Sequence, residues 1–122
     1  MKAIVVDDSR ATRTILRTAL KQEGFEVVEA GDGRQALDEL RKVGALDLAL
    51  VDWNMPVMNG YELICQVRAQ RQFDSMAIMM VTTESEASQV RRALDAGANE
   101  YVMKPFTPEI LREKLLLLGL KD

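Results

Sequence analysis

Five short apolar runs alternate with five longer stretches of helical period, and this alternation leaves the chain few folds to choose from. The runs are rich in β-branched residues and span residues 3–6, 27–30, 48–51, 77–81 and 101–103. Apolar residues spaced three and four apart predict helices over residues 11–23, 34–43, 61–70, 86–96 and 108–118. Strict alternation predicts an α/β fold in which helices cover both faces of one doubly wound, five-stranded parallel sheet.

The length of the chain fits one domain. With 122 residues it can bury a core of its own. No linker, repeat or low-complexity segment interrupts the alternation. We therefore expect one domain over residues 1–122, without a separate output domain. Gly24, Gly44 and Gly97 each follow a predicted helix, where a glycine C-cap with positive φ is favoured.

The scarcity of two residue types excludes several kinds of site. The chain has no histidine, so it has no Ser-His-Asp triad and no histidine-ligated zinc. Its one cysteine, Cys65, cannot form an internal disulfide. The net charge of −3, without a basic block, gives no reason to expect nucleic acid or a membrane as partner. The N-terminal apolar run is too short for a signal peptide, so we expect a cytoplasmic protein.

Polar residues follow four of the predicted strands directly. Right-handed crossovers place the carboxyl ends of parallel strands along one edge of the sheet, where ligands of such folds bind. The side chains brought to this edge are two carboxylates after the first strand, one after the third, a hydroxyl after the fourth and an amine after the fifth. These residues are Asp7, Asp8, Asp52, Thr82 and Lys104.

Such a group of carboxylates predicts a cation. Three carboxylates about 4 Å apart repel by roughly 4 kcal/mol per pair at an effective dielectric constant of 20. Oxygen ligands without histidine or cysteine favour a hard ion, and open positions for water suit Mg²⁺ better than Ca²⁺. The metal and Lys104 would together bracket a phosphoryl group, leaving one aspartate free as its nucleophile. The hypothesis is phosphoryl transfer to a carboxylate.

Each of these residues also has a simpler explanation. Asp8 or Ser9 would cap the following helix, and Asp52 would favour a turn. Lys104 would be a solvated lysine, and the Thr82 hydroxyl would bond to the backbone. These explanations account for each residue alone, but not for all of them at one edge. The combination therefore favours a site.

The motifs at this edge resemble a known family. They are Val5-Val6-Asp7-Asp8-Ser9, Val51-Asp52-Trp53-Asn54-Met55-Pro56 continuing to Asn59-Gly60, Val81-Thr82 and Lys104-Pro105-Phe106. In this order they are similar to the response-regulator receiver domain of bacterial two-component signalling, and the resemblance covers essentially the whole chain. It is closest to the stand-alone chemotaxis (CheY-like) type, because Trp53-Asn54 follows the acceptor, Glu84 lies two residues after Thr82, and Tyr101 is present.

The resemblance implies a flavodoxin-like sheet of strand order 2-1-3-4-5 and a role for each motif residue. Asp52 would accept a phosphoryl group from a phosphohistidine of a sensor histidine kinase. Mg²⁺, with Mn²⁺ as an alternative ion, would be held by Asp7, Asp8, Asp52 and the backbone carbonyl of Asn54. Lys104 would pair with a phosphoryl oxygen, and its bond to the following proline is expected to be cis.

Further roles concern switching and lifetime. Thr82 would bond to the phosphoryl group, and Tyr101 would move inward with it. Asn54 and Glu84 would flank the hydrolysing water and tune a weak self-catalysed dephosphorylation. Thr83 departs from the small Ala or Gly common at that position, so its bulk is expected to slow access of the phosphodonor.

The readout is expected to be a protein-binding surface. Phosphorylation adds charge and acceptor oxygens, and so biases a two-state element. We expect this surface to include Arg91, Arg92, Tyr101, Leu116 and Leu117. The sequence leaves open whether the target is a flagellar motor switch, another kinase or a phosphatase, and whether the protein acts as a phosphate sink.

Two other functions fit parts of the sequence. Gly31-Asp32-Gly33-Arg34-Gln35-Ala36 matches the G-x-G-x-x-A pattern of dinucleotide-binding folds, with Asp52 near the position of the ribose-binding acid. A nucleotide there would leave Lys104 and the paired aspartates unexplained, and Asp32 would equally serve as a helix cap. A Mg²⁺-dependent phosphohydrolase would use the same acidic edge, but the chain offers no lid to enclose a substrate.

Overall fold

The computed structural model describes residues 1–44 and 46–121, excluding the side chain of Glu84. The strands are β1 (Lys2–Val6), β2 (Glu26–Ala30), β3 (Leu48–Asp52), β4 (Ala77–Thr82) and β5 (Glu100–Met103). The helices are α1 (Arg10–Gln22), α2 (Gly33–Val43), α3 (Gly60–Arg68), α4 (Val90–Ala96) and α5 (Pro108–Leu117). Two 3₁₀ turns, η1 (Arg71–Phe73) and η2 (Glu84–Gln89), precede β4 and α4.

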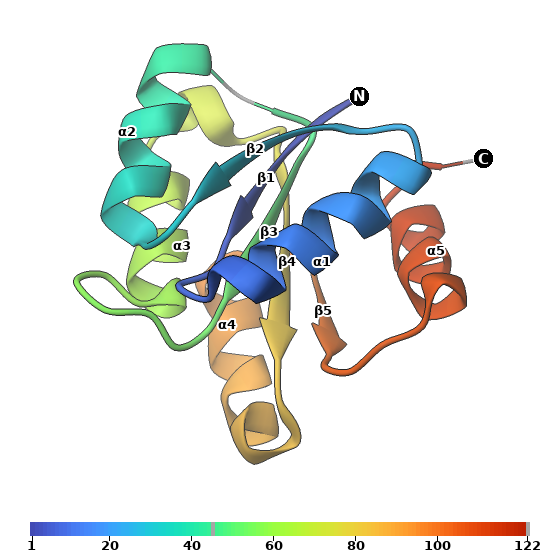
Figure 1. Ribbon diagram of the computed structural model, residues 1–122. Coiled ribbons are helices and arrows are strands. Elements are labelled where there is room, and N and C mark those ends of the chain that lie inside the picture. Colours follow the sequence, from blue (N-terminus) through green and yellow to red (C-terminus); the bar gives the residue numbers. More distant parts are fainter. Residues whose placement is uncertain (45, 122) are drawn as a thin grey trace.

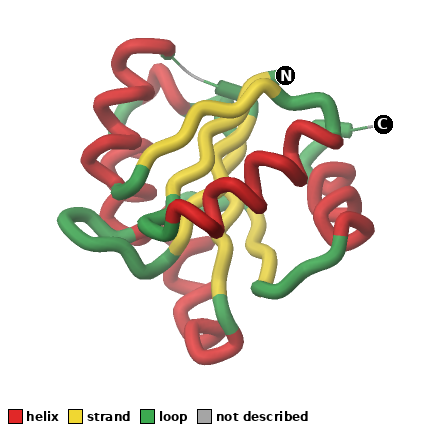
Figure 2. The backbone as a smooth tube through the Cα atoms, viewed as in Figure 1, coloured by secondary structure: helices red, strands yellow, loops and turns green. Residues whose placement is uncertain are grey.

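The five strands form one parallel sheet with the order β2-β1-β3-β4-β5, as predicted. Figure 1 shows α1 and α5 on one side of this sheet and α2, α3 and α4 on the other. Figure 2 shows the loops after the carboxyl ends of the strands gathered at one edge. The chain therefore has the doubly wound α/β architecture that the alternation indicates.

Side chains of the central strands alternate between two cores. In β1, Ile4 and Val6 face the core shared with α2, α3 and α4, whereas Ala3 and Val5 face the core shared with α1 and α5. The strands β3 and β4 alternate in the same way. Because both faces are buried, these strands are apolar throughout, which explains the continuous apolar runs in the sequence.

The helix ends follow local capping rules. Ser9, Asp32 and Asn59 each accept a hydrogen bond from a backbone amide in the first turn of the helix that follows. Gly24 and Gly97 follow α1 and α4 with φ of 93° and 121°, a conformation that side chains with a Cβ avoid. Ser9, not Asp8, is thus the cap of α1, which leaves the Asp8 carboxylate for another role.

The segment before β5 differs from its prediction. A helix over residues 86–96 was expected, but residues 84–89 form the 3₁₀ turn η2 and the α-helix begins only at Val90. The Glu86 carboxylate accepts a hydrogen bond from the Thr83 amide at 3.0 Å and so tightens the first turn of this segment. None of the described helices combines the length and the apolar character that a bilayer span requires.

Candidate functional site

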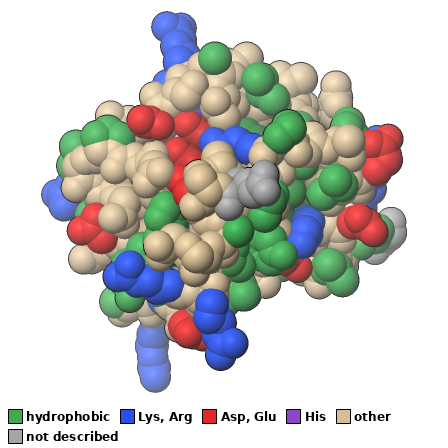
Figure 3. Space-filling view, turned by 90° about the horizontal axis from the view of Figure 1, so that it is seen from below, with side chains coloured by type: hydrophobic (Ala, Val, Ile, Leu, Met, Phe, Trp, Pro, Cys, Tyr) green, Lys and Arg blue, Asp and Glu red, His purple; other side chains and the backbone are tan. Residues whose placement is uncertain are grey.

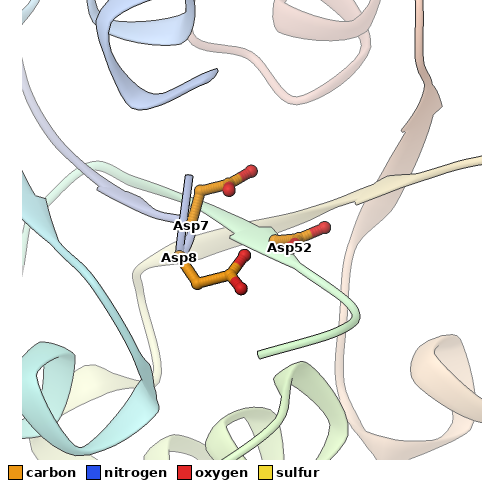
Figure 4. Close-up of side chains that lie close together, drawn as sticks. All are labelled: Asp7, Asp8 and Asp52. Atoms are coloured by element: carbon orange, nitrogen blue, oxygen red, sulfur yellow. The ribbon is translucent and has the colours of Figure 1, made fainter. Parts of the chain in front are cut away.

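Three aspartates meet at the carboxyl edge of the sheet. Val6 of β1 pairs with Val51 of β3, so the next residues, Asp7 and Asp52, lie side by side. A carboxylate oxygen of Asp8 completes a group in which one oxygen from each residue lies within 4.8 Å of the others. Figure 4 shows the three side chains pointing to the same side. The structure thus brings together the three carboxylates that the sequence assigns to this edge.

Within the described part of the chain, Lys104 is the basic side chain that forms ion pairs with these carboxylates, and it balances only part of their negative charge. The side chains of Asp7 and Asp52 are only 2% and 8% exposed. Lys104 Nζ lies 3.6 Å from Asp7 Oδ2 and 3.4 Å from Asp52 Oδ1. Burial and the charge of Asp7 raise the pKa of Asp52 to about 6, although Lys104 opposes both effects. A second cation would relieve the remaining repulsion.

The free carboxylate oxygens fit a hard divalent ion. Asp7 Oδ1 accepts a hydrogen bond from the Ser9 amide at 2.8 Å, whereas Asp7 Oδ2 is buried without a hydrogen-bond partner among the described residues. Lys104 Nζ, 3.6 Å from this oxygen, is shared with Asp52, and a buried carboxylate charge is costly unless cations face it. Oxygen donors with room for water suit Mg²⁺, and Mn²⁺ accepts the same ligands. The donor set therefore fits the predicted metal.

Thr82 brings a hydroxyl to the same edge. It ends β4, one residue beyond Val81, which pairs with Asp52. Its side chain is fully buried, and within the described part of the chain its Oγ1 has no hydrogen-bond partner. The simpler explanation, a hydroxyl bonded to the backbone, is therefore not what the structure shows. A buried, unpaired hydroxyl costs roughly 1–3 kcal/mol, so an acceptor arriving at the cluster would be favoured.

A family model described as "Response regulator receiver domain" matches residues 3–116. The chain belongs to this family. Receiver domains of the CheY type are phosphoacceptor switches rather than enzymes with a separate substrate, and the family binds Mg²⁺ at an acidic pocket. The Lys104–Pro105 peptide bond of this receiver domain is cis, as the resemblance implies.

Chemotaxis proteins are among its similar relatives. A chemotaxis protein CheY homolog of Campylobacter jejuni is 47% identical over 116 residues, which are 94% of this chain and 89% of the relative. The chemotaxis protein CheY1 of Helicobacter pylori is 44% identical and covered fully by the match, as is this chain. The solved structure of CheY4 from Vibrio cholerae superposes with a TM-score of 0.87 at 38% identity, covering 96% of this chain and 97% of the other.

Asn54 and its surroundings include a residue that the sequence prediction missed. The Asn54 side-chain amide donates a hydrogen bond to Glu86, whose other carboxylate oxygen accepts the Thr83 amide. Glu86 therefore ties the loop after Asp52 to the loop after Thr82. The signal was present in the sequence, because Thr83 and Glu86 have the T-x-x-E spacing of a capping box.

Glu84 and Tyr101 are the remaining residues to which the resemblance assigns a role in switching or dephosphorylation. The side chain of Glu84 lies outside the described part of the chain, so its predicted role stays a prediction. Tyr101 is half-buried against the core shared with α2, α3 and α4. Lys114 Nζ lies 4.6 Å from the centre of its ring and 3.0 Å from Glu100 Oε1. Tyr101 therefore lies at the edge strand, under a lysine of α5.

The predicted partner surface takes its residues from α4, β5 and α5, and α4 and α5 lie on opposite faces of the sheet. Leu116 and Leu117 of α5 are 48% and 73% exposed. Arg91 is exposed and pairs with Asp95 of its own helix. Arg92 instead lies 4.1 Å from the ring centre of Tyr61, so its guanidinium is on the side of α4 that faces α3. In Figure 3, acidic side chains gather near the middle of the receiver's carboxyl edge, with apolar side chains beside them.

The glycine-rich motif is explained by packing within the receiver fold. Asp32 caps α2 by accepting a hydrogen bond from the Gln35 amide at 2.9 Å, and the Gly31 amide donates to the Gln35 side chain. A Cβ on Gly33 would lie 2.8 Å from Met58 Cγ, so the glycine permits close contact with the loop after β3. The amides of Gly31, Gly33 and Gln35 all donate within the protein, and the match to the receiver family makes this motif a turn and helix cap rather than a dinucleotide site.

Proposed function

We propose that this receiver domain accepts a phosphoryl group on Asp52 in a Mg²⁺-dependent reaction and thereby switches a protein-binding surface, in chemotaxis or related signalling. The observation that carries the proposal is the group of carboxylates from Asp7, Asp8 and Asp52 beside a single ammonium group, Lys104. A bound cation would offset the repulsion among these carboxylates. One of them could then act as the nucleophile that accepts a phosphoryl group.

The transfer step uses a sensor histidine kinase as donor. A carboxylate oxygen of Asp52 attacks the phosphorus atom of the kinase phosphohistidine, a new O–P bond forms, and the P–N bond breaks with its electron pair going to the imidazole. Mg²⁺ held by Asp7, Asp8, Asp52 and the Asn54 carbonyl would neutralise charge on the phosphoryl oxygens. Lys104, already within 3.4 Å of Asp52, would pair with one of these oxygens.

Thr82 and Tyr101 would carry the signal outward. The Thr82 hydroxyl lacks a partner among the described residues, so a phosphoryl oxygen on Asp52 offers it a hydrogen bond that exists only in the phosphorylated state. A bond of this kind biases a two-state element. We infer that Tyr101 follows Thr82 inward, changing the β5 edge that partners contact.

The lifetime of the phosphoryl group would depend on Asn54 and Glu84, which we place beside the path of the hydrolysing water. Self-catalysed dephosphorylation is expected to be weak. Thr83 adds bulk next to Thr82 and is expected to slow access of small phosphodonors.

The downstream target is proposed to bind the surface around Tyr101 in the cytoplasm. Arg91, Leu116 and Leu117 are the other residues of this surface, and Arg92 extends it along the side of α4 that faces α3. A motor switch, a kinase or a phosphatase would each fit it. Replacing both leucines by aspartate should leave phosphorylation intact and abolish target binding, because the surface loses its exposed apolar side chains. Unchanged capture of the phosphorylated target would reject this surface.

Mass spectrometry with an acyl-phosphate donor tests the acceptor. With Mg²⁺, the wild-type protein should gain the mass of one phosphoryl group, whereas Asp52→Asn should gain none. Asp47→Asn is the matched control, since Asp47 is an exposed aspartate that accepts the Lys2 amide far from the cluster. Phosphorylation of Asp52→Asn to the wild-type extent would contradict the proposal. Turnover of a phosphate ester far beyond the protein concentration would instead indicate a phosphohydrolase.

A further inference from the structure

The turn that carries Asp7 and Asp8 is held by a guanidinium group that no motif includes. Arg13, one turn into α1, donates from Nη1 to the backbone carbonyl of Asp7 at 2.7 Å. The same turn is held by two further hydrogen bonds, from the Asp7 amide to the Ala30 carbonyl at 3.1 Å and from the Ser9 amide to Asp7 Oδ1. Of these three contacts, only the one from Arg13 depends on a side chain outside the turn.

Arg13 is itself oriented by an acidic residue of β2. Its Nε lies 3.4 Å from Glu29 Oε1, and Arg17 Nη1 lies 3.0 Å from Glu29 Oε2. The side chain of Arg13 is 19% exposed and that of Glu29 is 30% exposed, so both groups are largely shielded from water. A planar guanidinium can bond to a carbonyl and a carboxylate at once, which a lysine ammonium does with less directional precision.

A hydrogen bond from a charged donor is stronger than one between neutral groups, and it restricts its acceptor accordingly. Here the acceptor is the peptide group that joins Asp7 to Asp8, the two acidic residues of the turn. Groups that orient metal ligands without touching the ion commonly change metal affinity by roughly 10–100-fold. The hydrogen bond from Arg13 therefore restrains the positions of Asp7 and Asp8 through the backbone that joins them.

We propose that Arg13 is a positioning residue that sets the Mg²⁺ affinity of the acidic cluster by holding the Asp7–Asp8 turn, and that Glu29 orients it. The inference rests on the proposed function, because it takes the cluster to be the metal site. Arg17 contacts Glu29 but makes no contact with the turn in the hydrogen-bond pattern of the described residues.

The sign of the effect distinguishes position from charge. Arg13→Gln and Arg17→Gln each remove one positive charge from the same helix face. If charge alone mattered, both variants would bind Mg²⁺ more tightly, because a cation binds better where a nearby positive charge is lost. If Arg13 acts by holding the turn, Arg13→Gln weakens binding while Arg17→Gln leaves it nearly unchanged.

Titration calorimetry with Mg²⁺, well below the melting temperature of each variant, makes this comparison. We expect Arg13→Gln to weaken binding about tenfold, Arg13→Lys to weaken it less, and Arg17→Gln to stay within about twofold of wild type. Phosphorylation of Arg13→Gln by an acyl phosphate should be slow at limiting Mg²⁺ and recover at saturating Mg²⁺. A purely structural role would lower the melting temperature without moving the dissociation constant.

Several outcomes would overturn the inference. Wild-type affinity in Arg13→Gln, tighter binding in that variant, or an equal loss in Arg17→Gln would each do so. If Arg13→Gln does not fold, Arg13→Lys serves instead, because it keeps the positive charge and loses the directional bond of the guanidinium to the Asp7 carbonyl; a loss of about threefold is expected. A wild-type protein that takes up no Mg²⁺ would contradict the proposed function itself, a result distinct from all of these.

Discussion

A single buried carboxylate and a cluster of three carboxylates lie at opposite ends of the sheet, and their charges are balanced in opposite ways. Near the amino ends of the strands, Glu23 is 6% exposed and pairs with Arg112 at 3.2 Å and Lys121 at 3.3 Å. At the carboxyl ends, Asp7 and Asp52 share the ammonium group of Lys104, and Asp8 adds a third carboxylate to the same cluster. Glu23 thus pairs with two cations, whereas Asp7 and Asp52 pair with one between them.

The pKa shifts follow this difference in charge rather than burial. Burial raises the pKa of both Glu23 and Asp52. At Glu23 the bonds to Arg112 and Lys121 outweigh burial and lower the pKa, whereas at Asp52 the charge of Asp7 adds to burial and the pKa rises to about 6. Glu23, which pairs with two cations, links α5 and the C-terminal segment to the end of α1. The acidic cluster, which has too few cations for its charge, favours the binding of a further cation.

The largest effect that separates the two regions should be on Mg²⁺ binding. Mg²⁺ should quench the fluorescence of Trp53, which adjoins Asp52. Asp8→Ala should weaken this response at least about tenfold, since the loss of a ligand costs no less than the loss of a group that orients one. Glu23→Gln, the matched control, should respond as wild type does. A full response in Asp8→Ala would show that the three carboxylates do not act together.

Removing one charge from the acidic cluster should stabilise the metal-free protein. Asp52→Asn keeps the shape of the side chain and ends its repulsion with Asp7. We expect the free energy of unfolding in chelator to rise by about 1 kcal/mol at pH 7, less than the pKa shift alone implies because Lys104 and solvent screen the charge. Urea unfolding of both proteins measures this difference, and a destabilised variant would mean that the cluster has no excess charge.

The excess negative charge around Asp52 should also make the stability of the metal-free protein depend on pH. The pKa of folded Asp52, about 6, exceeds its ordinary value of 3.8, so between these values the folded protein binds more protons than the unfolded chain. In chelator, this residue should therefore add stability as the pH falls from 7 toward 5. The contribution should vanish in Asp52→Asn, and urea midpoints at pH 5, 6 and 7 compare the two. Identical slopes would assign the effect to other groups.

The smallest effect is expected at the amino end of the sheet. Glu23→Gln should destabilise the protein by about 0.5–1 kcal/mol at pH 7, because it removes the charge that Arg112 and Lys121 share. The pKa of Glu23 is lowered, so this contribution is present above its ordinary value of 4.5 and is lost as the pH falls below it. A stabilised variant would remove the contrast with Asp52.

Much of the acidic site could be predicted because each of its residues ends a strand or lies within two residues of its end. Val6 pairs with Val51, so Asp7 and Asp52 must lie side by side once β1 and β3 are known to be parallel neighbours. Thr82 and Lys104 follow in the same way from the ends of the fourth and fifth strands, and the family motifs add their roles toward the phosphoryl group. These residues can be located from their positions in the sequence alone, without knowing how the helices pack on the sheet.

Other contacts could not be predicted because they join distant segments through side chains alone. Glu23 and Arg112 are 89 positions apart, and no pattern links them. The bond between Asn54 and Glu86 depends on how two loops approach each other. Val57 has a φ of 67°, a conformation that a β-branched residue rarely adopts, and nothing around it in the sequence indicates this.

Alternating patterns of apolar residues by themselves determined the sheet, its coverage by helices and the edge at which the acidic residues gather. That result is local, because periodicity and strand ends are properties of neighbouring residues. Only the tertiary structure decided which carboxylates are balanced by cations and which side chain holds the Asp7–Asp8 turn. Charge balance depends on distances across the fold, and residues far apart in sequence, such as Arg13 and Glu29, set those distances.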